Sequence, residues 1–259
     1  MPKITIITIN YNNLIGLKRT VESVIHQTWQ EFEYVVIDGG STDGSAEYIE
    51  SQSTHFDYWV SEPDKGIYNA MNKGIAKATG EYLLFLNSGD HLYSDVVLEE
   101  ARKFLVERDL VYFDLNFVDK ANSKIGIYPE KLSFSHFIYD TLPHPATFIK
   151  SSLFSVVGLY DESLQIVSDW KFFILAVFKN NCRYLKVDAI LSTYYLDGIS
   201  SKSINKVIIE KERQKVLNAD FQGYVEDSNE LLALRTTVCN LRKSKKIGLL
   251  VKLGLIHKF

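Results

Sequence analysis

The chain has 259 residues, of which 46% are hydrophobic, 13% aromatic and 24% charged. This composition supplies a hydrophobic core and excludes collagen-like and disordered classes, and the length suits one large domain or two small ones. The formal net charge of −3 gives no case for nucleic acid as a partner.

The two cysteines also limit the classes of protein. Cys182 and Cys239 are far apart and belong to no CxxC motif or Cys/His cluster, which argues against zinc, iron–sulfur and disulfide frameworks. A reducing, cytoplasmic compartment is therefore expected. We expect no signal peptide, because the first residues run directly into a strand pattern. We also expect no membrane span, because no run of apolar residues is long enough.

Short β-rich segments alternate with helical segments through the first half of the sequence. Strands are predicted over residues 3–9, 32–37, 58–60, 82–86 and 110–118, and helices over residues 14–27, 44–52, 66–78 and 95–106. Asp43 is placed to cap the second of these helices. The alternation predicts an α/β fold, with a mostly parallel sheet that has helices on both faces.

The second half of the sequence is less regular. Residues 144–149 and 183–195 read as extended, and residues 168–179 and 206–220 as helical. No internal repeat or low-complexity linker divides the chain. We therefore expect one domain over residues 1–220, followed by a helical, basic tail over residues 221–259.

Three aspartates follow successive predicted strands. Asp38 ends the second strand, Asp64 follows the third, and Asp90 closes the turn after the fourth. Ligands of open α/β sheets bind beyond the carboxyl ends of the strands, so the three carboxylates are expected around one crevice. A divalent cation (Mn²⁺ or Mg²⁺) and the N–H and hydroxyl groups of a nucleotide would compensate their charge.

Each aspartate also has a simpler interpretation. Asp38 begins an Asp-Gly-Gly sequence that is typical of a polar turn, and Asp64 is placed to cap the helix that starts near Gly66. Residues 87–90 resemble any tight turn. On the pattern alone, both interpretations of each position stay open.

Four ordered segments resemble the successive motifs of family 2 glycosyltransferases. They are residues 8–12 (TINYN), 36–45 (VIDGGSTDGS), 62–72 (EPDKGIYNAMN) and 85–90 (FLNSGD). Residues 144–148 (HPATF) and 168–170 (SDW) are similar to the family's acceptor-side segment and its base-bearing motif. The resemblance spans roughly residues 3–200. It implies a Rossmann-like GT-A fold, with a nucleotide-sugar half over about residues 1–118 and an acceptor half over about residues 119–220.

The resemblance also implies roles for residues of the donor site. Asp38 would hydrogen-bond the nucleobase, with uridine nucleotides favoured. Asp64 would lie beside the base and the ribose, and the backbone near Thr8 and Asn10 would line the nucleoside pocket.

Residues 87–90 occupy the place of the family's metal-binding DxD motif. Asp90 would be the metal-binding carboxylate, while Asn87 replaces the first carboxylate and keeps a hydrogen-bond acceptor. Asp169 matches the catalytic base, with helix capping as the alternative. Asn69 stands where the family often has an aspartate.

The function that this resemblance implies is an inverting glycosyl transfer. A sugar would move from a nucleotide-diphosphate sugar to a hydroxyl of a glycan or lipid-linked sugar, in the synthesis of cell-surface exopolysaccharide or lipopolysaccharide. The alternative is a non-catalytic nucleotide-sugar-binding module, which would need Asp38 but not Asp169. A dinucleotide-binding oxidoreductase and a P-loop enzyme are rejected, because the first strand is not followed by a glycine-rich turn and no GxxxxGK[ST] sequence occurs.

The C-terminal tail carries a distinct charge pattern. Between residues 239 and 259 there are six Lys or Arg and no acidic residue, and residues 247–256 are mostly apolar. That run is too short to span a bilayer, but cations beside an apolar segment suit the surface of an anionic membrane. A helix docked on the domain, or a homodimer contact, is the alternative.

Overall fold

The computed structural model of the protein describes residues 3–119, 122–196, 203–255 and 257. Clustering of contacts divides the chain into two compact units, Met1–Arg213 and Gln214–Phe259. Each unit is described by itself below.

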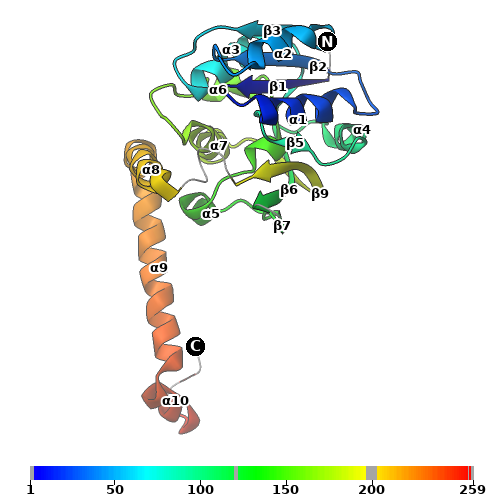
Figure 1. Ribbon diagram of the computed structural model, residues 1–259. Coiled ribbons are helices and arrows are strands. Elements are labelled where there is room, and N and C mark those ends of the chain that lie inside the picture. The colour runs from blue at the N-terminus through cyan, green and yellow to red at the C-terminus, as the bar shows by residue number, and fades with distance from the viewer. Residues whose placement is uncertain (1–2, 120–121, 197–202, 256, 258–259) are drawn as a thin grey trace. The chain divides into compact units, whose positions relative to one another are not determined.

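A mixed sheet forms the centre of the first unit (Figure 1). Its strands are β1 (Ile4–Asn10), β2 (Glu33–Asp38), β3 (Tyr58–Ser61), β4 (Tyr82–Phe85), β5 (His91–Leu92), β6 (Leu110–Asp119), β7 (Asn122–Gly126), β8 (Thr147–Lys150) and β9 (Tyr184–Tyr195). Their order across the sheet is β3-β2-β1-β4-β8-β6-β9-β5, with β7 paired to β6.

Parallel pairing dominates the N-terminal half of the sheet. Strand β1 is parallel to β2 and β4, and β2 is parallel to β3. Strand β8 then runs antiparallel to both β4 and β6, while β6 and β9 are parallel. The predicted α/β class with a mixed, helix-flanked sheet is confirmed.

The helices of the chain are α1 (Leu14–Ile25), α2 (Ser45–Ser51), α3 (Ile67–Lys77), α4 (Val97–Ala101), α5 (Phe134–Tyr139), α6 (Leu153–Val157), α7 (Ser168–Phe178), α8 (Lys206–Asp220), α9 (Gln222–Lys243) and α10 (Lys245–Lys252). Short 3-10 turns occur at η1 (Ser53–His55), η2 (Arg102–Phe104), η3 (His144–Ala146) and η5 (Ser203–Asn205).

Helices cover both faces of the parallel strands, so β1 is buried along its whole length. Ile4 and Ile6 of β1 belong to the same core cluster as Leu17 of α1. Ile7 faces the other way, against Gly74 of α3, where a Cβ atom would lie only 2.5 Å from the Ile7 side chain. This close contact lets α3 pack tightly on the sheet.

The register of the parallel strands brings their carboxyl ends to one edge of the sheet. Asn10 at the end of β1 pairs with Asp38 at the end of β2, and Asp38 pairs with Ser61 at the end of β3. The polar residues that follow these strands therefore gather at a single edge, as the sequence predicts.

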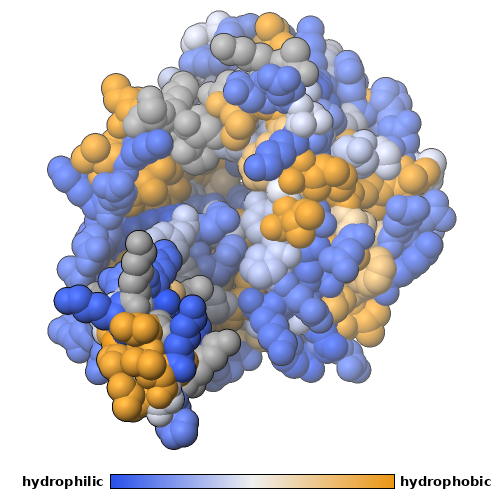
Figure 2. Space-filling view, turned by 90° about the horizontal axis from the view of Figure 1, so that it is seen from below, coloured by the Kyte–Doolittle hydropathy of each residue, from blue (hydrophilic) through white to orange (hydrophobic). Residues whose placement is uncertain are grey.

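The second unit contains the end of α8 together with α9 and α10. Ser244 has extended backbone (φ −71°, ψ 121°) and separates α9 from α10, which contact each other. Figure 2 shows an apolar patch at the end of the chain with strongly hydrophilic side chains on both sides of it. Over the described residues, the helices are all too short or too polar to cross a membrane.

Candidate functional site

Asp38 lies at the sheet edge and is held by four protein donors. Its Oδ1 atom accepts from Asn10 Nδ2 at 2.7 Å and from Ser41 Oγ at 2.6 Å. Its Oδ2 atom accepts from the backbone N–H of Ser41 at 2.9 Å and from Ser61 Oγ at 2.6 Å. Because an ionised carboxylate offers about four acceptor positions, Asp38 is saturated by the protein itself.

The same hydrogen bonds keep Asp38 charged. The side chain is fully buried, and burial by itself would raise its pKa. The bonds from Ser41, Ser61 and Asn10 outweigh burial and hold the pKa of Asp38 below its ordinary value. Asp38 is thus an anionic anchor for the turn that follows β2.

Asn10, unlike Asp38, has a side-chain oxygen that accepts no hydrogen bond in the described chain. Its Nδ2 atom donates to Asp38, and the residue is only 4% exposed. Within the described chain, its Oδ1 atom is buried and receives no hydrogen bond. A buried oxygen without a donor is costly, so this atom is an acceptor available to a ligand N–H or a water molecule.

The loop that carries Asp64 touches the turn after β2. Gly39 lies directly against the Asp64 carboxylate, and a Cβ atom at Gly39 would collide with Asp64 Oδ2. Asp64 Oδ1 accepts from the backbone N–H of Gly66 at 2.8 Å, just before α3. Asp64 therefore stabilises the start of α3 and also lies at the sheet edge. Tyr11 lies close to Gly39 and is 66% exposed, and no role was predicted for it from the sequence.

Thr8 lies inside the sheet. It is fully buried, and its hydroxyl donates to the carbonyl oxygen of Leu86 at 2.9 Å. Thr8 therefore ties β1 to the chain that enters the 87–90 turn, and its side chain does not open onto the edge of the sheet.

The 87–90 turn is fixed from two sides. The backbone N–H of Ser88 donates to the carbonyl oxygen of Ile9 at 3.0 Å. Thr20 of α1 donates its hydroxyl proton to the carbonyl oxygen of Asp90 at 2.6 Å and accepts from the backbone N–H of Gly89 at 3.0 Å. Gly89 has φ 111°, a conformation that favours glycine. The turn is therefore held in one geometry although it is longer than a DxD motif.

Asp90 and Asn87 are the candidate oxygen ligands for a cation. Asp90 is 7% exposed, and Asn87 Oδ1 is buried with no hydrogen-bond partner in the described chain. No three His, Cys, Asp or Glu side chains of the described residues gather closely enough to hold a metal by themselves. Mg²⁺ and similar hard cations bind few protein oxygens and complete their shell with phosphate oxygens. One carboxylate and one unpaired amide oxygen fit a cation that arrives with a diphosphate.

Asp169 occupies the first turn of α7 and is bound from another helix. The hydroxyl of Tyr68 in α3 lies 2.9 Å from Asp169 Oδ1 and 2.5 Å from the carbonyl oxygen of Ile166. Burial and the neighbouring carboxylate raise the pKa of Tyr68 well above its usual value, so the phenol keeps its proton. The N-cap of α7 is Val167, and no side chain makes a capping hydrogen bond at this end of the helix. This arrangement does not support the capping interpretation.

Helix α8 contacts the loop before Asp169. The carboxylate of Glu212 accepts from the backbone N–H groups of residues 165, 166 and 167 at 2.6, 3.1 and 3.3 Å. The Arg213 guanidinium lies 5.0 Å from the centre of the Trp170 ring. Burial lowers the pKa of Arg213, and the nearby Asp169 carboxylate partly offsets that effect. Neither residue was predicted from the sequence.

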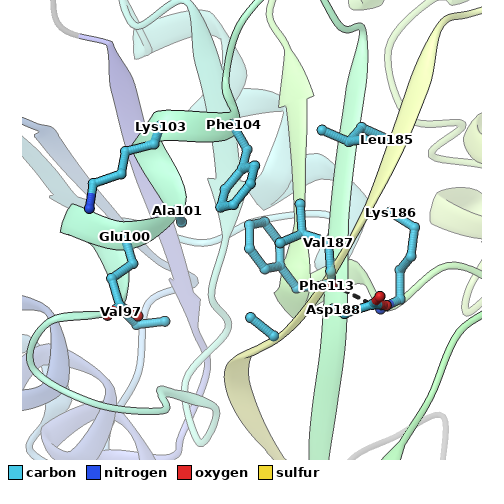
Figure 3. Close-up of a pocket in the computed structure, with 11 residues that line it drawn as sticks. Val97, Glu100, Ala101, Lys103, Phe104, Phe113, Leu185, Lys186, Val187 and Asp188 are labelled. Carbon is cyan, nitrogen blue, oxygen red and sulfur yellow. Dashed lines mark hydrogen bonds and ion pairs between the residues drawn. The ribbon is translucent and has the colours of Figure 1, made fainter.

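A separate groove of about 520 Å³ lies between α4 and β9 (Figure 3). Phe104 and Phe113 line its apolar part. Lys186, at one side of the groove, pairs with Asp114 at 2.8 Å and with Asp188 at 3.1 Å. The groove shares no lining residue with the predicted site.

Comparisons with known proteins identify the family of the chain. The sequence model described as glycosyl transferase family 2 matches residues 5–155. An uncharacterised glycosyltransferase of Mycobacterium tuberculosis is 35% identical over 205 residues, which cover 77% of this chain and 78% of the relative. A PGL/p-HBAD biosynthesis glycosyltransferase of Mycobacterium bovis is 30% identical over 221 residues, which cover 81% of this chain and 84% of the relative.

Solved structures share the fold at lower sequence identity. The Staphylococcus aureus TarS fragment 1–349 in complex with UDP matches with a TM-score of 0.62 and 20% identity, over 74% of this chain and 60% of that chain. The mannosyltransferase PcManGT from Pyrobaculum calidifontis, in complex with GDP-Man and Mn²⁺, matches with a TM-score of 0.59 and 15% identity, over 77% and 59% of the two chains.

Proposed function

The chain belongs to the family 2 glycosyltransferases and is a glycosyltransferase with the GT-A fold, and from this premise we propose an inverting transfer. A sugar passes from a nucleotide-diphosphate sugar, preferably a uridine nucleotide, to the hydroxyl of an acceptor. The observation that carries the proposal is the hydrogen bond from Tyr68 to Asp169. It connects the helix after the Asp64 loop to the candidate base.

The donor would bind at the edge formed by the turns after β1, β2 and β4. The unused Oδ1 atom of Asn10 would accept the N–H of the nucleobase, while Asp38 keeps the turn in place. Asp64 and the exposed ring of Tyr11 would flank the base and the ribose. Fold neighbours solved with UDP and with GDP-Man support a nucleoside diphosphate as the ligand class.

Asp90 and Asn87 would hold a Mn²⁺ or Mg²⁺ ion together with oxygens of the diphosphate. Such an ion neutralises the negative charge on the diphosphate. Thr20 holds the backbone on which Asp90 stands.

Asp169 would act as the general base. The acceptor hydroxyl loses its proton to Asp169 while its oxygen bonds to the anomeric carbon, and the bond from that carbon to the diphosphate oxygen breaks. Tyr68 orients the carboxylate, and Glu212 and Arg213 hold the segment around it.

We further propose a glycan or lipid-linked sugar as the acceptor, in the cytoplasm at the inner face of the membrane. The relative that is named for PGL/p-HBAD biosynthesis supports a glycolipid or cell-surface product.

The test is a screen of uridine and guanosine diphosphate sugars, with Mn²⁺ or with a chelator. We expect a uridine nucleotide sugar with Mn²⁺ to raise the melting temperature and to be consumed, with release of nucleoside diphosphate. Saturation at about 100 times Kd adds about 2.7 kcal/mol to the free energy of unfolding. Binding without consumption of any donor, with glycan and lipid-linked acceptors supplied, would favour the non-catalytic module.

The proposed metal site has its own prediction. Asp90→Ala should lower Mn²⁺-dependent turnover by roughly 10²–10³-fold, because a charge-stabilising group is lost from the diphosphate site. Asp95→Ala removes the same charge from an exposed position five residues away and serves as the matched control. Unchanged turnover and unchanged Mn²⁺ dependence in Asp90→Ala would exclude this site.

A further inference from the structure

The last part of the chain concentrates positive charge without any acid. Residues 239–259 contain six Lys or Arg and no Asp or Glu. Lys246 and Lys252 of α10 are both exposed, as are Arg242 and Lys243 at the end of α9. A surface of this kind attracts an anionic partner at distances of about a Debye length.

Apolar side chains are exposed within the same segment. Leu249, Leu253 and Leu255 are 58%, 62% and 67% exposed. Ile247 and Val251, on another side of α10, are half-buried. The three leucines thus present an apolar surface to solvent.

The order of residues along α10 places leucines between lysines. At about 100° per residue, Leu249 and Leu253 lie one turn apart on the same face, with Lys252 on one side of them and Lys246 on the other. Figure 2 shows the resulting apolar patch between hydrophilic side chains. Long lysine side chains in this position can keep their charge at a polar boundary while leucines enter an apolar layer.

We propose that residues 242–255 bind the surface of an anionic lipid bilayer. Leu249, Leu253 and Leu255 would enter the boundary of the acyl chains, and the flanking cations would lie at the lipid phosphates. Nucleic acid would pair with the cations but leave the leucines in water. A second copy would bring one acid-free cationic segment against another, where like charges repel. An anionic bilayer satisfies both features of the segment.

The experiment is sedimentation of the full chain with vesicles, in the absence of donor and acceptor, so it is independent of the proposed reaction. We expect binding to vesicles of phosphatidylglycerol and phosphatidylcholine and no binding to pure phosphatidylcholine. Leu249→Gln/Leu253→Gln should lower the partition coefficient roughly tenfold or more, since glutamine keeps the helix but loses apolar burial. Lys246→Gln/Lys252→Gln should lower it by roughly 25-fold at low salt, because each cation contributes about fivefold.

Matched controls remove similar groups from the first unit. Val156 and Leu159 are 64% and 56% exposed, so Val156→Gln/Leu159→Gln tests a general loss of exposed apolar surface. Lys103→Gln/Lys131→Gln removes two other exposed cations. Both controls should bind like the unmodified chain.

Three results would overturn the proposal. One is failure of the full chain to bind anionic vesicles. The second is equal loss of binding in the α10 variants and their controls. The third is a dimer in light scattering that dissociates in Leu249→Gln/Leu253→Gln while vesicle binding is unchanged, which would assign the patch to a second copy.

Discussion

Asp38 uses all of its acceptor positions within the protein, and this limits the role it can have toward a nucleotide. A direct contact with the base would require one of four donors to leave the carboxylate. The neighbouring Asn10 Oδ1 has no such competition. The resemblance predicts a nucleotide site at this edge, but the sequence could not show which of the two residues has a free acceptor.

Asp38→Asn should therefore destabilise the fold as well as the donor complex. The amide can accept fewer hydrogen bonds than the carboxylate, and at least one buried donor is left unpaired. We expect the free energy of unfolding to fall by about 1–3 kcal/mol and nucleoside diphosphate binding to weaken. Urea denaturation and titration calorimetry measure the two effects, with the exposed Asp95→Asn as control. Normal stability combined with lost binding would indicate a direct nucleobase contact instead.

Asp169→Asn should separate binding from chemistry. The amide keeps the shape of the side chain but cannot take the acceptor's proton, so we expect unchanged donor affinity and a loss of roughly 10²–10⁴-fold in transfer. Tyr68→Phe removes only the hydroxyl that orients Asp169 and should cause a smaller loss. Full transfer activity in Asp169→Asn, or loss of donor binding at normal turnover, would show that Asp169 is not the base.

The contacts of Asn69 favour an amide at this position, where the resemblance leads one to expect an aspartate. Its Nδ2 atom donates to Glu162 Oε2 at 2.9 Å, and Asn72 Nδ2 donates to Glu162 Oε1 at 2.9 Å. An aspartate at position 69 would place a second carboxylate against Glu162. The sequence shows the substitution but not its cause, because Glu162 is 93 residues away along the chain.

At the scale of elements, strong hydrophobic patterns predicted the structure well. Strand β1 and helix α3 each begin and end within one residue of the predicted positions. Strand β5 has only two residues, and β7 is largely exposed, so neither has an apolar pattern to detect. The predicted strand at 144–149 begins as a 3-10 turn instead, since Pro145 lacks an N–H for a ladder hydrogen bond.

Capping was predicted less accurately. Asp43 was expected at the N-cap of α2, but the N-cap is Gly44. The Asp43 carboxylate instead accepts from the backbone N–H groups of Ser45 and of Leu14, at 3.1 and 2.8 Å. One side chain thus stabilises the starts of α1 and α2 together, which is a tertiary contact that local sequence does not reveal.

Helix α8 should influence catalysis through Glu212. Glu212→Gln weakens the charge-assisted bonds to the three backbone N–H groups before α7, so Asp169 loses its fixed position. We expect the free energy of unfolding to fall by about 1–3 kcal/mol and kcat to decrease while KM for the donor stays unchanged. Glu210→Gln, at an exposed position of the same helix, is the control. If kcat were the same in both variants, Glu212 would have no role in placing the base.

At the scale of the whole molecule, several carboxylates make the fold sensitive to acid. Burial opposes ionisation of Asp38, Asp43 and Asp161, but hydrogen bonds outweigh it and lower the pKa of each. Among the interactions that lower the pKa of Asp161 to about 2, the hydrogen bond from Lys171 is the strongest. A folded-state pKa below the unfolded value stabilises the fold at higher pH, and this stability is lost as the pH falls through the folded value.

We therefore expect the urea midpoint to be nearly constant from pH 7 to 5 and to fall below about pH 4, near the ordinary pKa of Asp. Denaturation at pH 7, 5, 4 and 3 measures this change. Asp161→Asn should show a smaller decrease between pH 4 and 3 than the unmodified chain. A midpoint that stays constant down to pH 3 would contradict the prediction.

The α/β class could be predicted from the alternation of strand and helix patterns. The family could be recognised from four short motifs, because these motifs record the backbone turns at the strand ends. The compact units divide along the chain within α8, after Arg213. The expected domain boundary after residue 220 stays a prediction. A continuous helical pattern over residues 206–220 gives no signal of such a division.

The single proton of Tyr68 has a further consequence for the proposed reaction. Its hydroxyl lies within reach of two acceptors, Asp169 Oδ1 and the carbonyl oxygen of Ile166. While Asp169 is ionised, Tyr68 donates to it. If Asp169 takes the acceptor's proton as proposed, it would donate to the Tyr68 oxygen, and Tyr68 would turn its own proton toward the carbonyl oxygen of Ile166. Asp169 would then keep a hydrogen bond to Tyr68 in both protonation states, through rotation of one hydroxyl and without any movement of the backbone.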